Sequence, residues 1–158
     1  MGNKKTERKT FAFLILVLLF ALLLRLVFFS GISASDDLEY THLAYQMSKN
    51  EFSFPATHHA TRLGIIYPVS VLYGFFGVSE YSSVVFPLLV SIVGIVLIFY
   101  FGKLFFNEKV GLIAAFLLSF FPLDVVLATK LLSDIPSAFF LSLSIFLFLG
   151  EFIIKVFN

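Results

Sequence analysis

Three carboxylates stand within four positions of this chain, and no other segment of the sequence concentrates acid in this way. Asp36, Asp37 and Glu39 follow directly on a long apolar run, in the sequence Ser35-Asp-Asp-Leu-Glu-Tyr40. A carboxylate can take the proton of an acceptor hydroxyl or hold that hydroxyl for attack. The same acids can also be explained without chemistry, because acidic residues at the start of a helix cap it and favour its dipole.

The composition predicts the environment in which this acid cluster works. Hydrophobic residues make up 59% of the 158 residues and charged residues 13%. The apolar residues come in runs of roughly 20, the length that crosses a bilayer core of about 30 Å. We therefore expect a multi-span helical membrane protein. The absence of Cys excludes thiolate chemistry, and a net charge of +1 predicts no nucleic-acid partner.

Four spans are expected, at residues 11–29, 81–101, 110–127 and 135–154, within a single module over residues 1–158. The first ten residues carry Lys4, Lys5, Arg8 and Lys9, which by the positive-inside rule predicts a cytoplasmic N-terminus in the cell membrane. The loop over residues 30–80 then lies outside the membrane. A loop of this length usually carries function or its own structure.

Two juxtamembrane helices are expected in this loop. Asp36-x-x-Glu39 is typical of a capping box, and an apolar stripe follows it. Pro68 fits the first turn of a second short helix over Val69–Phe76. The sequence thus predicts that the helix with the acid cluster lies near the outer membrane surface.

The predicted topology brings acids and cations to one side of the membrane. The residues expected there are Asp36, Asp37, Glu39, His58, His59, Arg62, Asp124, Lys130 and Asp134. Cations beside a carboxylate can stabilise a leaving phosphate. Such a site could transfer a group from a phosphate donor anchored in the membrane.

The cations of this set have simpler interpretations as well. Arg62 and Lys130 are candidates for binding a donor phosphate, while Arg62 could equally be an interfacial anchor. Arg25 lies near the outer end of the first span, where it could snorkel to the interface or point at the phosphate of a lipid. The adjacent pair His58-His59 lacks metal-ligand spacing, so a solvated loop is favoured over a metal site.

In order along the chain, these features resemble the N-terminal module of GT-C fold glycosyltransferases, the protein mannosyltransferase-like membrane enzymes that use polyprenyl-phosphate sugars. The motifs that carry the resemblance are an Arg near the end of span one, Asp36-Asp37-x-x-Tyr40 with Ala44-Tyr45, Arg62-Leu-Gly-Ile-Ile-Tyr-Pro68, Gly-Lys-x-Phe-Phe at 102–106, and Leu-x-Asp134-x-Pro136.

The resemblance implies an inverting glycosyltransferase with a catalytic acid in the first external loop. Within that loop we expect Asp37 first and Asp36 second, with Asp134 as a further acidic position or as a cap of the fourth span. Members of this family commonly have eight or more spans. The chain is therefore expected to be a fragment or to need a partner that supplies further spans. The resemblance leaves open whether a divalent metal takes part.

Two other classes remain as alternatives. A non-catalytic membrane scaffold or subunit would keep the fold without the complete site. A small transporter would place ionisable residues at mid-bilayer, where this sequence has none, so transport is the least favoured.

Overall fold

Every regular element in the described part of the chain is a helix. The computed structural model describes residues 4–33, 35–54 and 57–157, with side chains described within 8–151. Three of its helices are long and apolar enough to cross a membrane: α1 (Lys4–Val27), α4 (Glu80–Phe105) and α7 (Asp134–Phe157). Two shorter helices, α2 (Asp36–Ser48) and α3 (Leu63–Phe76), lie between α1 and α4 in sequence. The predicted class, an all-α membrane fold with two helices in its first long loop, is confirmed.

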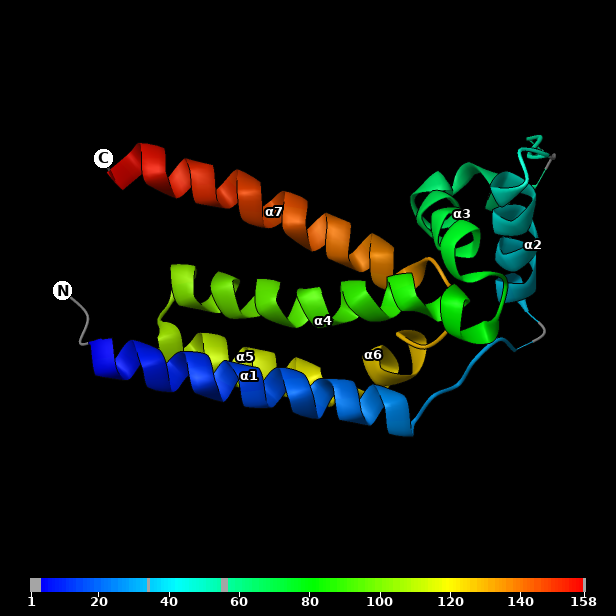
Figure 1. Cartoon of the computed structure of the whole chain (residues 1–158). Coiled ribbons are helices and arrows are strands. Elements are labelled where there is room, and N and C mark those ends of the chain that lie inside the picture. Colours follow the sequence, from blue (N-terminus) through cyan, green and yellow to red (C-terminus); the bar gives the residue numbers. More distant parts are fainter. Residues whose placement is uncertain (1–3, 34, 55–56, 158) are drawn as a thin grey trace.

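The long helices pack into a bundle that carries α2 and α3 at one end (Figure 1). Helix α4 contacts α1, α3, α5 and α7, so it is the centre of the arrangement. Helix α7 packs on α4 near its own start and diverges from it toward the C-terminus (Figure 1). Apolar side chains of α1, α4 and α5 form the core of the bundle: Leu14, Val17, Ala21, Ile95, Phe99 and Ala115.

The segment predicted as a continuous third span is two helices. Helix α5 (Glu108–Ser119) stops at Phe120, and α6 (Pro122–Leu127) begins two residues later. Pro122 causes this break, because a residue before proline avoids the helical region and proline itself favours a first helical position. Phe121 accordingly has extended backbone angles, φ −62° and ψ 118°. That the segment as a whole crosses the membrane stays a prediction.

The predicted start of the second juxtamembrane helix is wrong. Helix α3 begins at Leu63, so Pro68 lies inside it and not in its first turn. The ring of a helical proline crowds the carbonyl four residues earlier, and that residue here is Gly64, which has no side chain. Ile65 and Ile66 are buried in the core between α2 and α3, and this burial extends the helix toward its N-terminus.

Helices α4 and α5 approach each other through two glycines. A Cβ added to Gly102 would lie 2.6 Å from the Cα of Gly111, and a Cβ on Gly111 would collide with the backbone carbonyl of Phe99. Small residues allow this close backbone contact, which is a common packing mode of membrane helices. The glycines therefore fix the position of α5, and with it the start of α6.

Candidate active site

The carboxylate of Asp37 is buried under the loop that precedes α2. The residue is 1% exposed. Its side chain accepts hydrogen bonds from the backbone N–H groups of Ser33, Ser35 and Leu38, the last two at 3.0 Å, and from the hydroxyl of Ser33 at 3.3 Å. Four donors therefore occupy the acceptor positions of one buried carboxylate. Asp37 thus holds the loop and the helix start together.

The predicted capping box of α2 is absent. Ser35 occupies the N-cap position and its side chain makes no capping bond, while Asp36 is the first helical residue. The loop folds back over the helix start, so that Asp37 receives the free amide groups that a capping side chain would otherwise bind. Asp36 remains exposed, with 56% of its side chain accessible.

His59 bridges α2 and the short 3-10 helix η1 (His58–Thr61). Its Nε2 lies 3.3 Å from the Oδ2 of Asp36, and its Nδ1 lies 3.0 Å from the Oε2 of Glu39, although neither contact has hydrogen-bond geometry. The ring is 7% exposed and packs edge-on against Tyr40. The expectation of a solvated loop is correct for His58, which is exposed, and wrong for His59. Within the described residues, no group of three or more His, Cys, Asp or Glu could hold a metal ion.

Arg62 lies at the mouth of a cleft between α3 and α7. The guanidinium donates to the hydroxyl of Tyr40 and, at 2.8 Å, to that of Ser133. The cleft has a volume of about 400 Å³ and is lined by residues of the first turns of both helices and by Phe140: Arg62, Gly64, Ile65, Ser133, Pro136, Ser137 and Phe140. Helix N-termini carry a partial positive charge and attract anions. The N-termini of α3 and α7 and the guanidinium of Arg62 therefore border the same cleft.

The other two predicted residues of this region have separate positions. Lys130 donates from its ammonium to the hydroxyl of Ser33 at 2.9 Å, so it reaches the loop before α2 and makes no described contact with Arg62. Asp134 is the exposed first residue of α7, and its side chain makes no hydrogen bond or ion pair with the described residues. The predicted cap of the fourth span is therefore wrong, because a capping side chain must accept a backbone N–H of the first turn. The predicted catalytic role of Asp134 stays a prediction.

Arg25 is fully buried, which contradicts the expectation that it snorkels to the interface. Its Nε donates to the hydroxyl of Ser91 at 2.8 Å, and its Nη1 donates to the carbonyls of both Ala21 and Ser119. Its Nη2 forms an ion pair with Asp124. All three nitrogens are therefore engaged inside the bundle. This occupancy removes the basis for the predicted contact between Arg25 and a donor phosphate.

The break between α5 and α6 creates this arrangement. Helix α5 ends at Ser119 and leaves its carbonyl without a continuing helix, while α6 carries Asp124 back toward α1. The sequence contained a usable signal, since an Arg inside an apolar span needs a partner and charged groups within membranes usually pair. Local sequence does not identify the partner, because Asp124 lies 99 residues further along the chain.

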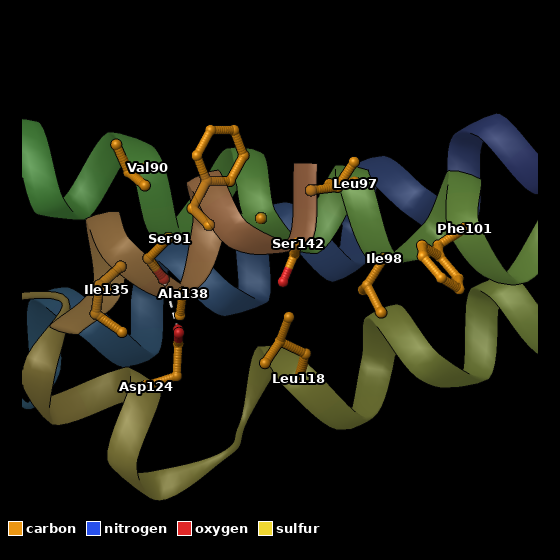
Figure 2. Close-up of a pocket in the computed structure, with 12 residues that line it drawn as sticks. Val90, Ser91, Leu97, Ile98, Phe101, Leu118, Asp124, Ile135, Ala138 and Ser142 are labelled. Carbon is orange, nitrogen blue, oxygen red and sulfur yellow. Dashed lines mark hydrogen bonds between the residues drawn. The ribbon is translucent and has the colours of Figure 1, made fainter. Parts of the chain in front are cut away.

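Asp124 also borders an apolar cleft between α4 and α7 (Figure 2). Its Oδ2 accepts a hydrogen bond of 2.6 Å from Ser91, the contact drawn in Figure 2. The cleft has a volume of about 290 Å³, and its remaining wall is mostly aliphatic and aromatic.

Comparison with known families agrees with this description. The family model of dolichyl-phosphate-mannose-protein mannosyltransferases matches residues 63–153, more than half of the chain. The chain belongs to this family. The predicted resemblance to GT-C membrane glycosyltransferases is thereby confirmed at the level of the family. The matched region begins one residue after Arg62, so it contains α3 to α6 and most of α7 and leaves out the acid cluster of α2. No curated protein and no solved structure matches the chain.

Proposed function

We propose that this chain is the acceptor-facing module of a membrane glycosyltransferase that moves a sugar, in one inverting step, from a polyprenyl-phosphate donor to an acceptor outside the cytoplasm. The family name supplies the model for the donor class and for a protein acceptor. Residues 1–158 act as one module in this proposal, with the N-terminus cytoplasmic. Further spans, from the same chain or from a partner subunit, complete the enclosure of the donor.

The observation that carries the proposal is the cleft between the first turns of α3 and α7. A phosphate bound there would meet Arg62, the hydroxyls of Ser133 and Ser137, and the positive ends of two helix dipoles. The Nη1 of Arg62 donates to both Tyr40 and Ser133, so the other two guanidinium nitrogens could donate to a phosphate. It is therefore a suitable donor-phosphate ligand.

Tyr40 connects helix α2, which carries the acids, to Arg62 of this cleft. The Tyr40 hydroxyl accepts a hydrogen bond from Arg62, and Tyr40 lies one helical turn after Asp36 and Asp37. A residue that touches the arginine and a residue that carries an acid therefore share one short helix. This connection supports a common site for the donor phosphate and the acceptor hydroxyl.

Of the two adjacent acids, we propose Asp36 as the base and Asp37 as the residue that shapes the loop. The sequence favours Asp37. Burial supports the reverse order, because the oxygens of Asp37 already bind four protein donors while Asp36 is 56% exposed. A general base must come within hydrogen-bond reach of the acceptor hydroxyl, and an exposed carboxylate can do so.

The proposed step balances without any further reactant. The acceptor oxygen attacks the anomeric carbon of the sugar, and the bond between that carbon and the phosphate oxygen breaks. Polyprenyl phosphate leaves with the electron pair, beside Arg62. The proton of the acceptor hydroxyl passes to the carboxylate of Asp36. Attack from the face opposite the leaving group inverts the anomeric configuration.

Three substitutions in the full chain test the assignment. Transfer is measured from a radiolabelled polyprenyl-phosphate mannose to a peptide, in native membranes that contain the chain and any partner that supplies further spans. Asp36→Asn should lower transfer by about 10²-fold or more, the usual contribution of a positioned base, with unchanged thermal stability. Arg62→Ala should weaken donor binding. Asp37→Asn should lower stability by about 1–3 kcal/mol, because it removes the charge from a buried hydrogen-bond acceptor.

Glu51→Gln is the matched control, since Glu51 is an exposed acid of the same loop outside α2. Full transfer activity in Asp36→Asn would reject Asp36 as the base. A folded but inactive Asp37→Asn beside an active Asp36→Asn would assign the base to Asp37. Equal and small losses in both variants would leave the acid cluster with a structural role only.

A further inference from the structure

The loop between α1 and α2 is tied to the segment after α6 at two points. The backbone N–H of Ser30 donates to the hydroxyl of Thr129 at 3.0 Å, and the ammonium of Lys130 donates to the hydroxyl of Ser33 at 2.9 Å. Thr129 is fully buried. Two successive residues after α6 therefore hold two points of the loop that leads into the acid cluster.

The second tie continues to a buried acid. Ser33 accepts from Lys130 and donates, through both its backbone N–H and its hydroxyl, to the Oδ2 of Asp37, the hydroxyl at 3.3 Å. A serine hydroxyl has one donor and two acceptor positions, so it can serve both partners at once. Lys130, Ser33 and Asp37 thus form a continuous chain of hydrogen bonds with a charge at each end.

The segment that carries Lys130 has a firm attachment of its own. Asp124, in α6, is paired with Arg25 of α1 and accepts a hydrogen bond from Ser91 of α4. Ala128 is fully buried one residue before Thr129. Helix α6 is therefore fixed to two long helices of the bundle. The loop before α2 packs on the start of α4 through Phe29 and Tyr81, and its hydrogen bonds to other segments go to Thr129, Lys130 and Asp37.

We propose that Lys130 is a positioning residue, which sets the loop at the start of α2, and thereby Asp36, through its hydrogen bond to Ser33. This role differs from the phosphate contact that the sequence suggests for Lys130. It rests on the proposed function as far as Asp36 is concerned. The geometric part, the order imposed on the loop, is independent of any activity.

Amide hydrogen exchange of the full chain in lipid nanodiscs, read by mass spectrometry, tests the geometric part. Lys130→Met keeps the aliphatic stem and removes the ammonium, so exchange in residues 30–38 should become about tenfold faster when the charge-assisted bond is lost. Ser33→Ala should accelerate the same peptides, and Lys130→Arg should restore slow exchange. Lys103→Met, which removes a lysine from an exposed pair with Glu108, should leave these peptides unchanged.

Transfer kinetics test the link to the site. If Lys130 acts through Ser33, then Lys130→Met and Ser33→Ala should each lower kcat, and the double variant should lose no more than the larger single loss. If Lys130 instead bound the donor phosphate, Lys130→Met would raise the KM for the donor, and its effect would add to that of Ser33→Ala.

Unchanged exchange in residues 30–38 of Lys130→Met would overturn the proposal, as would additive losses with a raised donor KM. Absence of transfer in native membranes, where any partner that supplies further spans is also present, would refute the proposed function and leave the exchange result standing. If Lys130→Met gave faster exchange but an unchanged kcat, Lys130 would order the loop without any effect on catalysis. This result would reject the positioning role.

Discussion

Removing one partner of the buried pair between Arg25 and Asp124 should be among the most destabilising single changes in this fold. Arg25 is 0% exposed and the side chain of Asp124 is 14% exposed. We expect Arg25→Met to lower the free energy of unfolding by about 3–5 kcal/mol, the range for removing one partner of a buried ion pair. Such a loss would be a large part of the stability of a typical domain.

The size of the loss follows from what Arg25→Met leaves behind. Asp124 keeps its charge and retains the hydrogen bond from Ser91, but it loses the guanidinium. The carbonyl of Ser119, at the end of α5, loses a donor at 3.1 Å, and an unsatisfied buried acceptor costs about 1–3 kcal/mol. The methionine side chain fills most of the space of the arginine stem, so a large cavity is not part of the loss.

Replacing both partners gives the sharper test. Arg25→Met combined with Asp124→Leu removes both charges, and apolar replacements of buried pairs are often neutral or stabilising. The double variant should therefore recover most of the stability that Arg25→Met loses. The matched control is Lys103→Met, which breaks an exposed pair with Glu108 at 3.5 Å and should cost about 0–1 kcal/mol.

Unfolding of the full chain in mixed micelles with increasing denaturing detergent, followed by far-ultraviolet circular dichroism, measures these differences. A loss below about 1 kcal/mol for Arg25→Met would place the pair in the range of exposed salt bridges and refute the reasoning. A double variant less stable than Arg25→Met would also refute it, since the charge left unpaired would then not be the cause of the loss.

Two further predictions concern packing and topology. Gly102→Ala or Gly111→Ala should lower stability in thermal unfolding by about 1–3 kcal/mol, the range for overpacking, because the added methyl groups collide with the facing backbone. Gly74→Ala, with nothing within 4 Å of its Cβ, should be neutral or slightly stabilising. Equal effects at all three positions would reject the close α4–α5 contact as the cause. Single cysteines at the exposed positions Ser53 and Phe106 should differ in labelling by a membrane-impermeant thiol reagent in intact cells, with only the first reactive; labelling of the second alone would invert the proposed orientation.

The family and the helical membrane class could be predicted from local features of the sequence. Apolar runs of roughly bilayer length must form helices in a membrane, since the backbone polar groups have no other partners there. The short motifs around Arg62, Gly102 and Asp134 then indicated a glycosyltransferase family that the match over residues 63–153 confirms. The candidate cation Arg62 also needed little more than its place in the loop, at the start of α3.

The order of the two acids depends on the fold. Asp36 and Asp37 are adjacent and chemically identical, so no local pattern separates them. The difference arises because Lys130 and Thr129, almost a hundred residues away, hold the loop over one carboxylate and leave the other exposed. The burial of His59 also depends on tertiary contacts, since η1 packs on α2 through this residue.

Arg25 shows most clearly that local sequence does not predict contacts between distant residues. By itself the sequence determined that a charged residue stands near the end of an apolar helix, and snorkelling would satisfy such a charge if no partner were near. Only the tertiary structure decided that the charge stays inside, because Pro122 breaks the third apolar segment and the glycine contact between α4 and α5 sets where the broken helix resumes. Asp124 then meets Arg25 in a place that neither residue specifies alone, since an ion pair between distant positions requires the packing that brings them together.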